Sequence, residues 1–452
     1  MARSCRAVLM TVPMAGRASI PRFPVPPLAR RIFDIAEALD SEARIVGGAV
    51  RDWVLDARSS ALAQSDGPPS PHARSGDIDM SIACPIARAV DALRDAGLKI
   101  VETGLVHGTV TVIADGQTIE LTQTRIDLDT DGRHAVIGFT DDWAEDARRR
   151  DFTVNALYIT ADGTLEDPLG GLADLAAGRL RFVGNAKTRI TEDALRMLRY
   201  CRFLPRFGQT GIDDEALAAI GAMAAQAAHL SGERVAHECR RLFAAQAPLA
   251  GVRVMHESGL DEHALGLRLQ PHLLKNLPPF DVLQQAFAAT AASVWLLPFA
   301  VVLPAGAANT DAVIKRLRLS RAESRFLTSL DKHGSYIAEQ GLAGESLADG
   351  DVPDRGLAGK DWHRPAWFLR RDGHDPAAIY LVQTARGGTP VSAGRLLDIA
   401  AWQPPQCPVT ATDLLSHGVD KGPALGDMLC AIEHRWVMHD FTLTRAELLA
   451  AI

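Results

Sequence analysis

The sequence lacks several features that would assign it to a special class of protein. It contains no run of about 18 apolar residues, so we expect no transmembrane helix. None of its six cysteines belongs to a CxxC pair, which argues against a disulfide framework or a zinc site and favours reduced thiols in the cytoplasm. With 23% charged and 47% hydrophobic residues, the composition excludes a chain that is disordered, collagen-like or coiled-coil throughout.

Acidic residues are absent from the N-terminal segment, which contains Arg3, Arg6 and Arg17 among other arginines. We predict that residues 1–28 form a basic, disordered tail, with a targeting segment as the alternative. The whole chain has a net charge of −7, which argues weakly against a protein that coats nucleic acid. It leaves room for a local basic groove, because the position of charges decides what they attract.

The spacing of apolar residues changes along the chain. Alternating and β-branched runs predict strands at residues 44–46 and 77–82 and a hairpin of strands 107–113 and 117–124. Helical spacing predicts helices at 50–56 and 85–96. Residues 59–75 are rich in proline and serine and predict an exposed loop, and the polar residues 125–140 predict a mobile one. From residue 190 onward the helical period dominates. We therefore expect an α/β head followed by an all-helical remainder.

Asp77 and Asp79 lie two residues apart in a predicted strand, so their side chains point to the same face. Paired carboxylates can bind divalent ions that stabilise the attacking and leaving oxygens of phosphoryl transfer. Magnesium is the expected ion because it prefers carboxylate oxygens. From this pattern alone, the alternative is a surface strand with two solvated acids.

Gly47 and Gly48 separate a predicted strand from a predicted helix, and Arg51 falls in the first turn of that helix. Glycines let the backbone approach an anion, free N–H groups at a helix start attract phosphate, and arginine can donate two hydrogen bonds to it. Gly48 and Arg51 are therefore candidate phosphate contacts. An ordinary strand–turn–helix connection is the alternative, and the dinucleotide and P-loop fingerprints are missing.

Two further segments are rich in arginine. Arg148, Arg149 and Arg150 are consecutive and are followed by Asn155, which could hydrogen-bond a ribose hydroxyl; a solvated charge run is the alternative. In the second segment, cationic and acidic residues recur every third position of a predicted helix, at Asp193, Arg196, Arg199 and Arg202. Asp193 and Arg196 could read the edge of a base, while an ordinary i, i+3 ion pair is the alternative.

In this order, these segments resemble class II nucleotidyltransferases of the polymerase-β superfamily, the family of CCA-adding tRNA nucleotidyltransferases and bacterial poly(A) polymerases. The matching strings are GGAVRD at 47–52, GDIDMS at 76–81, RRDFTVNAL at 149–157, DPLGGLADL at 167–175 and EDALRMLRYCRF at 192–203. The resemblance implies an α+β fold with a polymerase-β-like head that contains a mixed β-sheet. It also implies these domains: the head at 29–165 with an insertion at 59–75, a helical neck at 166–245, and a helical body and tail at 246–452.

The resemblance also implies a role for each candidate residue. Asp77 and Asp79 would be the catalytic magnesium ligands, and Glu120 is a candidate third carboxylate. Gly48, Arg51, Arg150 and Asn155 would contact the nucleotide. On the predicted helix 192–203, Asp193 and Arg196 would accept CTP and then ATP, and Arg199 and Arg202 would complete the pocket. The loop at 125–140 would help the switch from C to A.

The implied function is addition of C, C and A to the 3′ end of tRNA from CTP and ATP, with release of pyrophosphate. The helical body would grip the acceptor arm, and we expect no membrane and no stable protein partner. The runner-up is a poly(A) polymerase, followed by enzymes that add only CC or only A. Residues 447–452 are not strongly basic, which favours CCA addition. A non-catalytic RNA-binding relic is disfavoured because Asp77 and Asp79 are intact.

Overall fold

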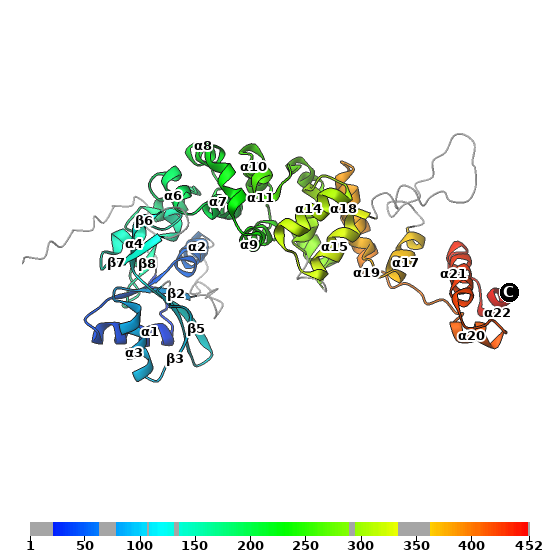
Figure 1. Ribbon diagram of the computed structural model, residues 1–452, viewed down its shortest axis with the longest axis horizontal. Coiled ribbons are helices and arrows are strands. Elements are labelled where there is room, and N and C mark those ends of the chain that lie inside the picture. The colour runs from blue at the N-terminus through cyan, green and yellow to red at the C-terminus, as the bar shows by residue number, and fades with distance from the viewer. Residues whose placement is uncertain are drawn as a thin grey trace, which may run out of the picture. The chain divides into compact units, whose positions relative to one another are not determined.

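The computed structural model describes residues 21–62, 78–105, 108–130, 135–288, 294–332 and 362–450. The chain divides into two compact units, Met1–Leu230 and Ser231–Ile452. The border between them falls inside the predicted neck. Within the described ranges, all β-strands lie in the first unit (Figure 1), and no helix is long and apolar enough to cross a membrane.

A seven-stranded mixed sheet forms the centre of the first unit, with the strand order β3-β4-β5-β2-β1-β8-β9. The strands are β1 (Ala43–Val46), β2 (Ile78–Ile82), β3 (Lys99–Gly104), β4 (Thr109–Ala114), β5 (Gln117–Gln123), β8 (Tyr158–Ile159) and β9 (Leu165–Glu166). The β2–β5 pair is parallel, and the other pairs are antiparallel. The α+β prediction with a mixed sheet is therefore confirmed.

Strand β2 shows why one face of this sheet is core. Ile78, Met80 and Ile82 alternate along it and are all buried. Helices α1 (Pro27–Ala38) and α3 (Ile86–Asp95) pack against one another and against the sheet. Both are amphipathic, and each buries its apolar face in this contact. Asp79 and Ser81 consequently point to the opposite face.

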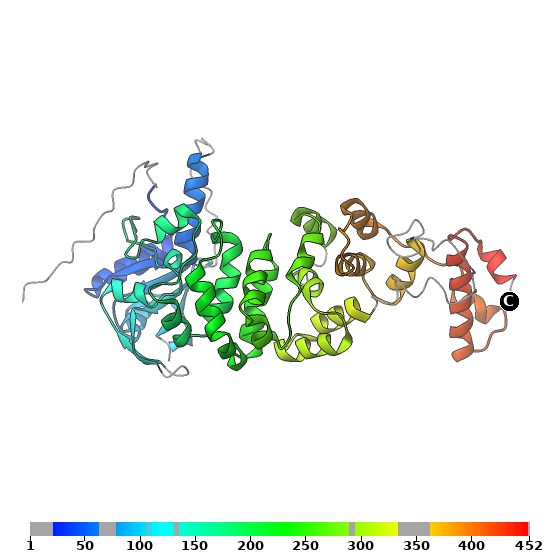
Figure 2. The same ribbon diagram turned by 90° about the horizontal axis from the view of Figure 1, so that it is seen from above.

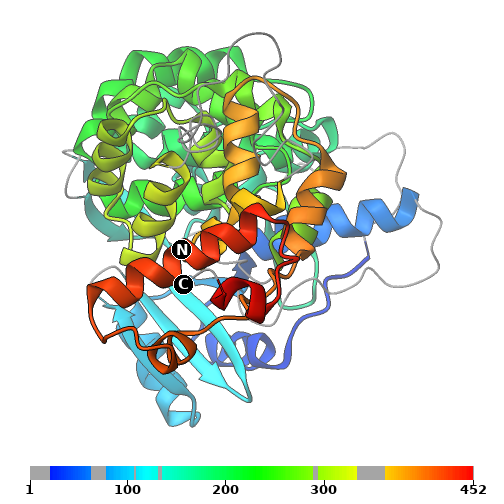
Figure 3. The same cartoon turned by 90° about the vertical axis from the view of Figure 1, so that its right-hand side faces the viewer.

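Helix α2 (Gly48–Leu62) begins directly after β1 and extends past the sheet with its last turns (Figures 2 and 3). Residues 59–62 of the predicted insertion loop belong to this helix, and residues 63–77 lie outside the described part. At the N-terminus, Phe23 is buried and its N–H donates to the carbonyl oxygen of Gly163 at 3.0 Å. The described residues 21–28 are thus packed, unlike the disordered tail that we predicted through residue 28; residues 1–20 are not described.

The predicted mobile loop at 125–140 is instead largely a two-stranded antiparallel sheet. It consists of β6 (Arg125–Thr130) and β7 (Ala135–Phe139). Isoleucine and leucine alternate with two aspartates along β6, which is the period of a strand. The high polarity of the segment concealed that alternation.

The neck is helical, but its central element differs from the prediction. Its helices and 3₁₀ turns within the first unit are α5 (Gly171–Ala177), α6 (Ala186–Glu192), α7 (Leu195–Phe207), α8 (Asp214–Met223) and η3 (Ala224–His229), and the head ends with α4 (Trp143–Arg148) and η2 (Thr153–Asn155) before them. The predicted helix 192–203 is broken at Asp193, whose backbone is extended between α6 and α7. Packing of α7 explains the break: Tyr200 and Phe203 pack with Phe152 and Phe182, which sets the direction of α7.

The second unit is all-helical in the part that the structure describes. Its elements are α9 (Gly232–Phe243), α10 (Leu249–Glu257), α11 (Leu260–Leu265), η4 (Pro271–Asn276), α12 (Phe280–Ala286), α13 (Leu296–Val302), α14 (Ala307–Leu317), α15 (Arg321–Lys332), α17 (His363–Arg371), α18 (Pro376–Arg386), α19 (Ala393–Ala401), α20 (Ala411–Ser416), α21 (Pro423–Met438) and α22 (Arg445–Leu449). Every residue of α13 is buried, and this helix packs against α18, α15 and α9. A separate apolar cluster around Trp367 and Trp436 joins α17 to α20, α21 and α22.

Candidate functional site

The exposed face of the sheet brings two carboxylates together. Asp79 on β2 is in register with Glu120 on the parallel neighbour β5, and both are exposed. Residues in register on adjacent strands point to the same face with their Cβ atoms about 5 Å apart. Asp77, the other predicted acid, lies outside the described residues, one position before β2. Within the described ranges, no group of three or more His, Cys, Asp or Glu residues could hold a metal ion.

The glycine turn lies directly against this acidic face. Gly47 has a φ of +77°, which favours glycine, and a Cβ atom there would stand 3.4 Å from Oδ2 of Asp79. Gly48 is the first residue of α2, and a Cβ atom on it would lie 3.5 Å from a guanidinium nitrogen of Arg51. The free N–H groups at the start of α2 therefore adjoin the carboxylate of Asp79, a setting suited to a phosphate that carries a cation.

Arg51, Asn155, Asp151 and Arg199 form one chain of hydrogen bonds. Nη1 of Arg51 donates to Oδ1 of Asn155 at 2.5 Å, whose amide nitrogen donates to Asp151 at 2.9 Å. Nε of Arg199 donates to the other oxygen of Asp151 at 2.7 Å. Three sequence motifs that are far apart along the chain are thereby joined at one place.

Burial and neighbouring charges shift the pKa values of Arg51 and Asp151 in this chain of hydrogen bonds. Burial lowers the pKa of Arg51, although Asp52 beside it acts in the opposite direction. Burial would raise the pKa of Asp151, but Arg199 and the hydrogen bond from Asn155 outweigh it, so this pKa lies below its ordinary value. The Arg51 guanidinium also lies over the ring of Phe207, at 4.3 Å from the ring centroid. Asp151 is therefore ionised, and Arg51 is held rigidly beside α7.

A buried acid, Asp146, fixes the position of the Arg150 guanidinium. Its guanidinium donates to Oδ2 of Asp146 at 3.0 Å, to the hydroxyl of Tyr158 at 3.1 Å and to Oγ of Ser81 at 3.4 Å. Ser81 is two residues from Asp79 on β2, so Arg150 reaches the same face of the sheet. Asp146 is fully buried and also accepts from Arg149 at 3.0 Å. Burial would raise its pKa, but Arg150 and Arg149 hold it below the ordinary value.

Asp193 does not lie within a helix as the sequence suggested, although the N–H of Arg196 still donates to its carbonyl oxygen at 3.0 Å. Asp193 accepts from the N–H of Leu195 at 3.0 Å and so caps the start of α7. Arg196 pairs with Glu192 at 2.5 Å and donates to the carbonyl oxygens of Arg189 and Arg149, at 2.9 and 2.8 Å. The link to Arg149 joins α7 to the segment that carries Arg150.

The last predicted arginine lies on the same side of α7. The guanidinium of Arg202 stands 3.9 Å from the ring centroid of Phe203, and that of Arg199 stands 5.5 Å from it. The structure thus connects most of the predicted site residues through direct contacts. Sequence reasoning missed Asp146 and Glu192 as ion-pair partners. Both lie three or four residues from the arginines that they bind, a spacing that could have identified them.

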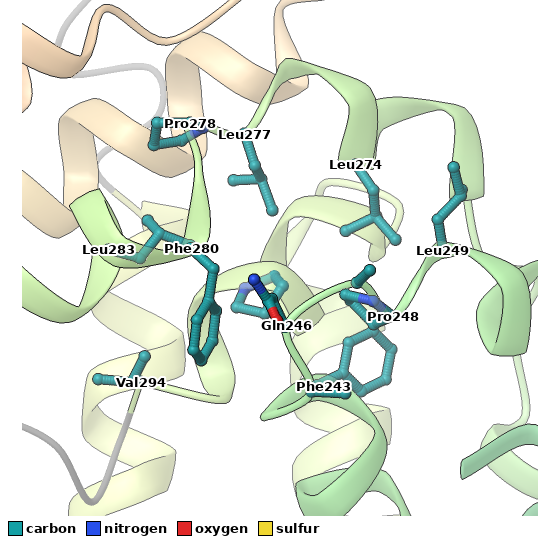
Figure 4. Close-up of a pocket in the computed structure, with 13 residues that line it drawn as sticks. Phe243, Gln246, Pro248, Leu249, Leu274, Leu277, Pro278, Phe280, Leu283 and Val294 are labelled. Atoms are coloured by element: carbon teal, nitrogen blue, oxygen red, sulfur yellow. The ribbon is translucent and has the colours of Figure 1, made fainter. Parts of the chain in front are cut away.

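An apolar pocket lies in the unit Ser231–Ile452 and differs in character from the carboxylate face. The pocket has a volume of about 210 Å³. Figure 4 shows its wall, which includes Phe243, Leu274 and Phe280. Gln246 is the one polar side chain among its lining residues, and no charged side chain lines it. It offers no ligand for a metal ion and no cation for a triphosphate, so the carboxylate face of the sheet is the better candidate for chemistry.

Comparisons with known proteins identify similar chains. Residues 43–181 match the family model described as poly A polymerase head domain, and residues 211–274 match the model described as probable RNA and SrmB-binding site of polymerase A. The chain is 29% identical over 426 residues to the mitochondrial CCA tRNA nucleotidyltransferase 1 of Mus musculus, covering 91% of this chain and 86% of the relative. It is also 29% identical to the CCA-adding enzyme of Levilactobacillus brevis, covering 94% of this chain and 97% of the relative.

The fold is shared with solved structures as well. The crystal structure of the Bacillus stearothermophilus CCA-adding enzyme in complex with CTP matches with a TM-score of 0.63 at 22% identity. The match covers 92% of this chain and 94% of that one. At 22% identity, this structural similarity shows a shared fold and no more.

Proposed function

Because this chain belongs to the family of CCA-adding tRNA nucleotidyltransferases and bacterial poly(A) polymerases, we propose that it adds C, C and A to the 3′ end of tRNA. CTP and ATP are the substrates, and pyrophosphate is released. The observation that carries this proposal is the similarity, over most of both chains, to enzymes named for CCA addition. The body of the second unit serves as the RNA-binding part.

Enzymes of this family generally depend on a divalent metal ion. The donor set of the sheet face fits such an ion, because the carboxylates of Asp79 and Glu120 are hard oxygen ligands in register on adjacent strands. Asp77 and Asp79 would hold magnesium, with Glu120 as the third carboxylate. When bound, magnesium lowers the pKa of the attacking 3′-hydroxyl and balances the charge of the leaving pyrophosphate.

The residues beside Asp79 bind and orient the triphosphate. N–H groups at the start of α2, next to Gly48, donate hydrogen bonds to a phosphate oxygen, and the buried Arg51 supplies a fixed positive charge. Arg150 also contacts the triphosphate, and its guanidinium is fixed by the hydrogen bond to Asp146 at 3.0 Å. Asn155 lies beside the sugar, and Arg199 and Arg202 complete the pocket. Catalysis depends on positioning and electrostatics, because fixed charges cost no reorganisation during the reaction.

Base selection falls to Asp193 and Arg196. A carboxylate accepts from the exocyclic amine of cytosine or adenine, and a guanidinium donates to ring nitrogens or carbonyl oxygens. Guanine and uracil would leave donors facing donors or acceptors facing acceptors, at a cost of about 1–3 kcal/mol for each buried unpaired group. The ion pair of Arg196 with Glu192 supports this role, because it restricts the guanidinium to one orientation. The hairpin β6–β7 is the candidate element for the switch from C to A.

A cytoplasmic location is the finer part of this proposal. It rests on the cysteines of the described residues, which are free thiols. Relatives include mitochondrial proteins, so fractionation of cells is the appropriate test.

The function is tested with purified protein and a tRNA that ends before its CCA. Magnesium is supplied together with each labelled nucleoside triphosphate, singly and in a mixture. A product longer by three residues, formed only when CTP and ATP are both present, supports the proposal. A ladder of A residues would indicate a poly(A) polymerase, and no product would contradict nucleotidyl transfer.

A further inference from the structure

Asp193 and Arg196, which the proposed function assigns to base selection, share one backbone partner. The carbonyl oxygen of Arg189, in the last turn of α6, accepts from Nη1 of Arg196 at 2.9 Å and from the N–H of Asp193 at 3.4 Å. Asp193 is the first residue after α6, whereas Arg196 belongs to α7. The position of the Arg189 backbone therefore affects both residues, although the break between the two helices separates them.

The side chain of Arg189 fixes that backbone in place. Its Nη1 donates to the carbonyl oxygen of Arg148 at 2.7 Å, and its Nη2 pairs with Oε1 of Glu192. The other oxygen of Glu192 accepts from Nη1 of Arg196 at 2.5 Å. One carboxylate thus bridges two guanidinium groups, and the planar fork of Arg189 allows it to hold a carbonyl and a carboxylate at the same time.

Both guanidinium groups also bind the end of one helix. Arg148 is the last residue of α4, and Arg149 is its C-cap. Their carbonyl oxygens accept from Arg189 at 2.7 Å and from Arg196 at 2.8 Å, respectively. The C-terminus of a helix carries partial negative charge and carbonyl groups without a partner inside the helix, so it stabilises cations. Because Arg150 follows directly, base selection and the triphosphate contact are anchored at the same end of α4.

The three charged side chains of this arrangement are largely buried. Their exposed fractions are 15% for Arg189, 12% for Glu192 and 14% for Arg196. Solvent therefore screens the attraction between them only weakly. Without the Arg189 side chain, Glu192 would turn both of its oxygens towards Arg196, because a carboxylate and a guanidinium favour a bidentate pair. That rotation would move the Arg196 guanidinium out of its present orientation.

We propose that Arg189 is a positioning residue for base selection, which acts through Asp193 and Arg196 and does not itself touch the nucleotide. This inference rests on the proposed function, which assigns base selection to those two residues. Arg189 keeps the Arg196 guanidinium in the orientation that suits cytosine and adenine. When Arg189 is absent, the guanidinium adapts to other bases, and uracil is no longer excluded by mismatched donors and acceptors.

The test compares the full-length variant R189A with the unchanged protein. Values of kcat/KM are measured for CTP and for UTP with magnesium and a tRNA that ends before its CCA. The ratio of kcat/KM for CTP to that for UTP should fall by about 10-fold, because one mispaired buried group no longer discriminates against uracil. A purely structural role would lower both values together and leave the ratio unchanged.

A milder variant and a matched control separate positioning from stability. R189K keeps the charge and the aliphatic stem but lacks the planar fork, so its ratio should also fall. The control is R386A on α18, where a side chain that is 9% exposed donates to the carbonyl oxygen of Ala300 at 3.0 Å and to Asp331 at 2.9 Å. R386A should lower the thermal midpoint as R189A does, but its ratio for CTP over UTP should equal that of the unchanged protein.

The inference is overturned if R189A selects CTP over UTP as strongly as the unchanged protein, or if R386A lowers the ratio equally. R189K decides the question if R189A does not fold. Equilibrium binding of CTP and UTP without tRNA gives a second ratio that needs no turnover. If the unchanged protein transfers no nucleotide, the proposed function fails, and the binding ratios of the variants still decide the inference. If it adds C, C and A while R189A keeps the full ratio, only the inference fails.

Discussion

The same side chain, arginine, serves two purposes in the two units of this protein. In the first unit, Arg51, Arg150 and Arg196 are largely buried, and each guanidinium is fixed by two or more hydrogen bonds. On α15 of the second unit, Arg321 and Arg325 are exposed and form no ion pair with another described residue. Fixed arginines select the geometry of a small ligand, whereas exposed ones attract a long polyanion through charge.

The largest expected effect separates chemistry from RNA binding. Asp79→Ala should lower the rate of CMP incorporation by about 10³-fold or more, because several kcal/mol of charge stabilisation in the transition state are lost. Its affinity for tRNA should remain unchanged. Single-turnover incorporation and salt-dependent binding measure the two quantities. A variant with nearly full incorporation would refute the role of Asp79, and since Asp79 is exposed, its thermal midpoint should hardly move.

Stability should respond to the buried pairs and not to the exposed ones. Asp146→Ala leaves Arg149 and Arg150 without their buried acid and should lower the free energy of unfolding by about 3–5 kcal/mol. Glu257→Ala breaks the exposed pair with Arg253 and should cost no more than about 0.5 kcal/mol. Urea unfolding measures both. If both variants lost the same free energy of unfolding, burial would not determine how much these ion pairs stabilise the protein.

Replacing arginine by lysine distinguishes fixed geometry from charge. Arg51→Lys keeps the charge but loses the fork that binds Asp52 and Asn155, so kcat/KM for CTP should fall by about 10–100-fold. Arg321 is exposed on α15, so Arg321→Lys should leave kcat/KM for CTP unchanged. Steady-state kinetics with CTP give the comparison. If Arg51→Lys is fully active, Arg51 contributes charge alone.

Acid should weaken the first unit through Asp146 and Asp151. The pKa of each lies below its ordinary value because the bound arginines outweigh burial. Their stabilisation is fully present above the unfolded pKa of about 3.9 and is lost as pH falls through the lower folded values. The free energy of unfolding should therefore fall below about pH 4, and less steeply in Asp146→Asn. Parallel curves for the two proteins, measured by urea unfolding, would contradict this assignment.

Local patterns predicted the parts of the site that depend on a few consecutive residues. Alternation in β2 and the glycine turn after β1 were sufficient to single out Asp79 and Gly48 as candidates, and the fold brings the two segments together, since a Cβ on Gly47 would lie 3.4 Å from Asp79. The resemblance to a known family supplied the order of the motifs. Asp77 lies outside the described residues and stays a prediction.

Tertiary packing decided what local patterns could not. Periodicity alone favoured one helix through Asp193, but the aromatic packing of Tyr200 and Phe203 turns the chain there. The bond between Arg51 and Asn155 joins residues 104 positions apart, and no local rule predicts such a contact. We predicted a loop in place of the hairpin β6–β7 because the segment is polar, although apolar and acidic residues alternate along β6.

We propose that Asp79 and its neighbours on this face of the sheet catalyse the addition of C, C and A to the 3′ end of tRNA. Sequencing the 3′ ends of a tRNA incubated with magnesium, CTP and ATP tests it most directly, with the unchanged protein and Asp79→Ala side by side. The unchanged protein should complete the sequence CCA and stop, and Asp79→Ala should add nothing. Runs of A, unextended ends with the unchanged protein, or equal extension by both would contradict the claim.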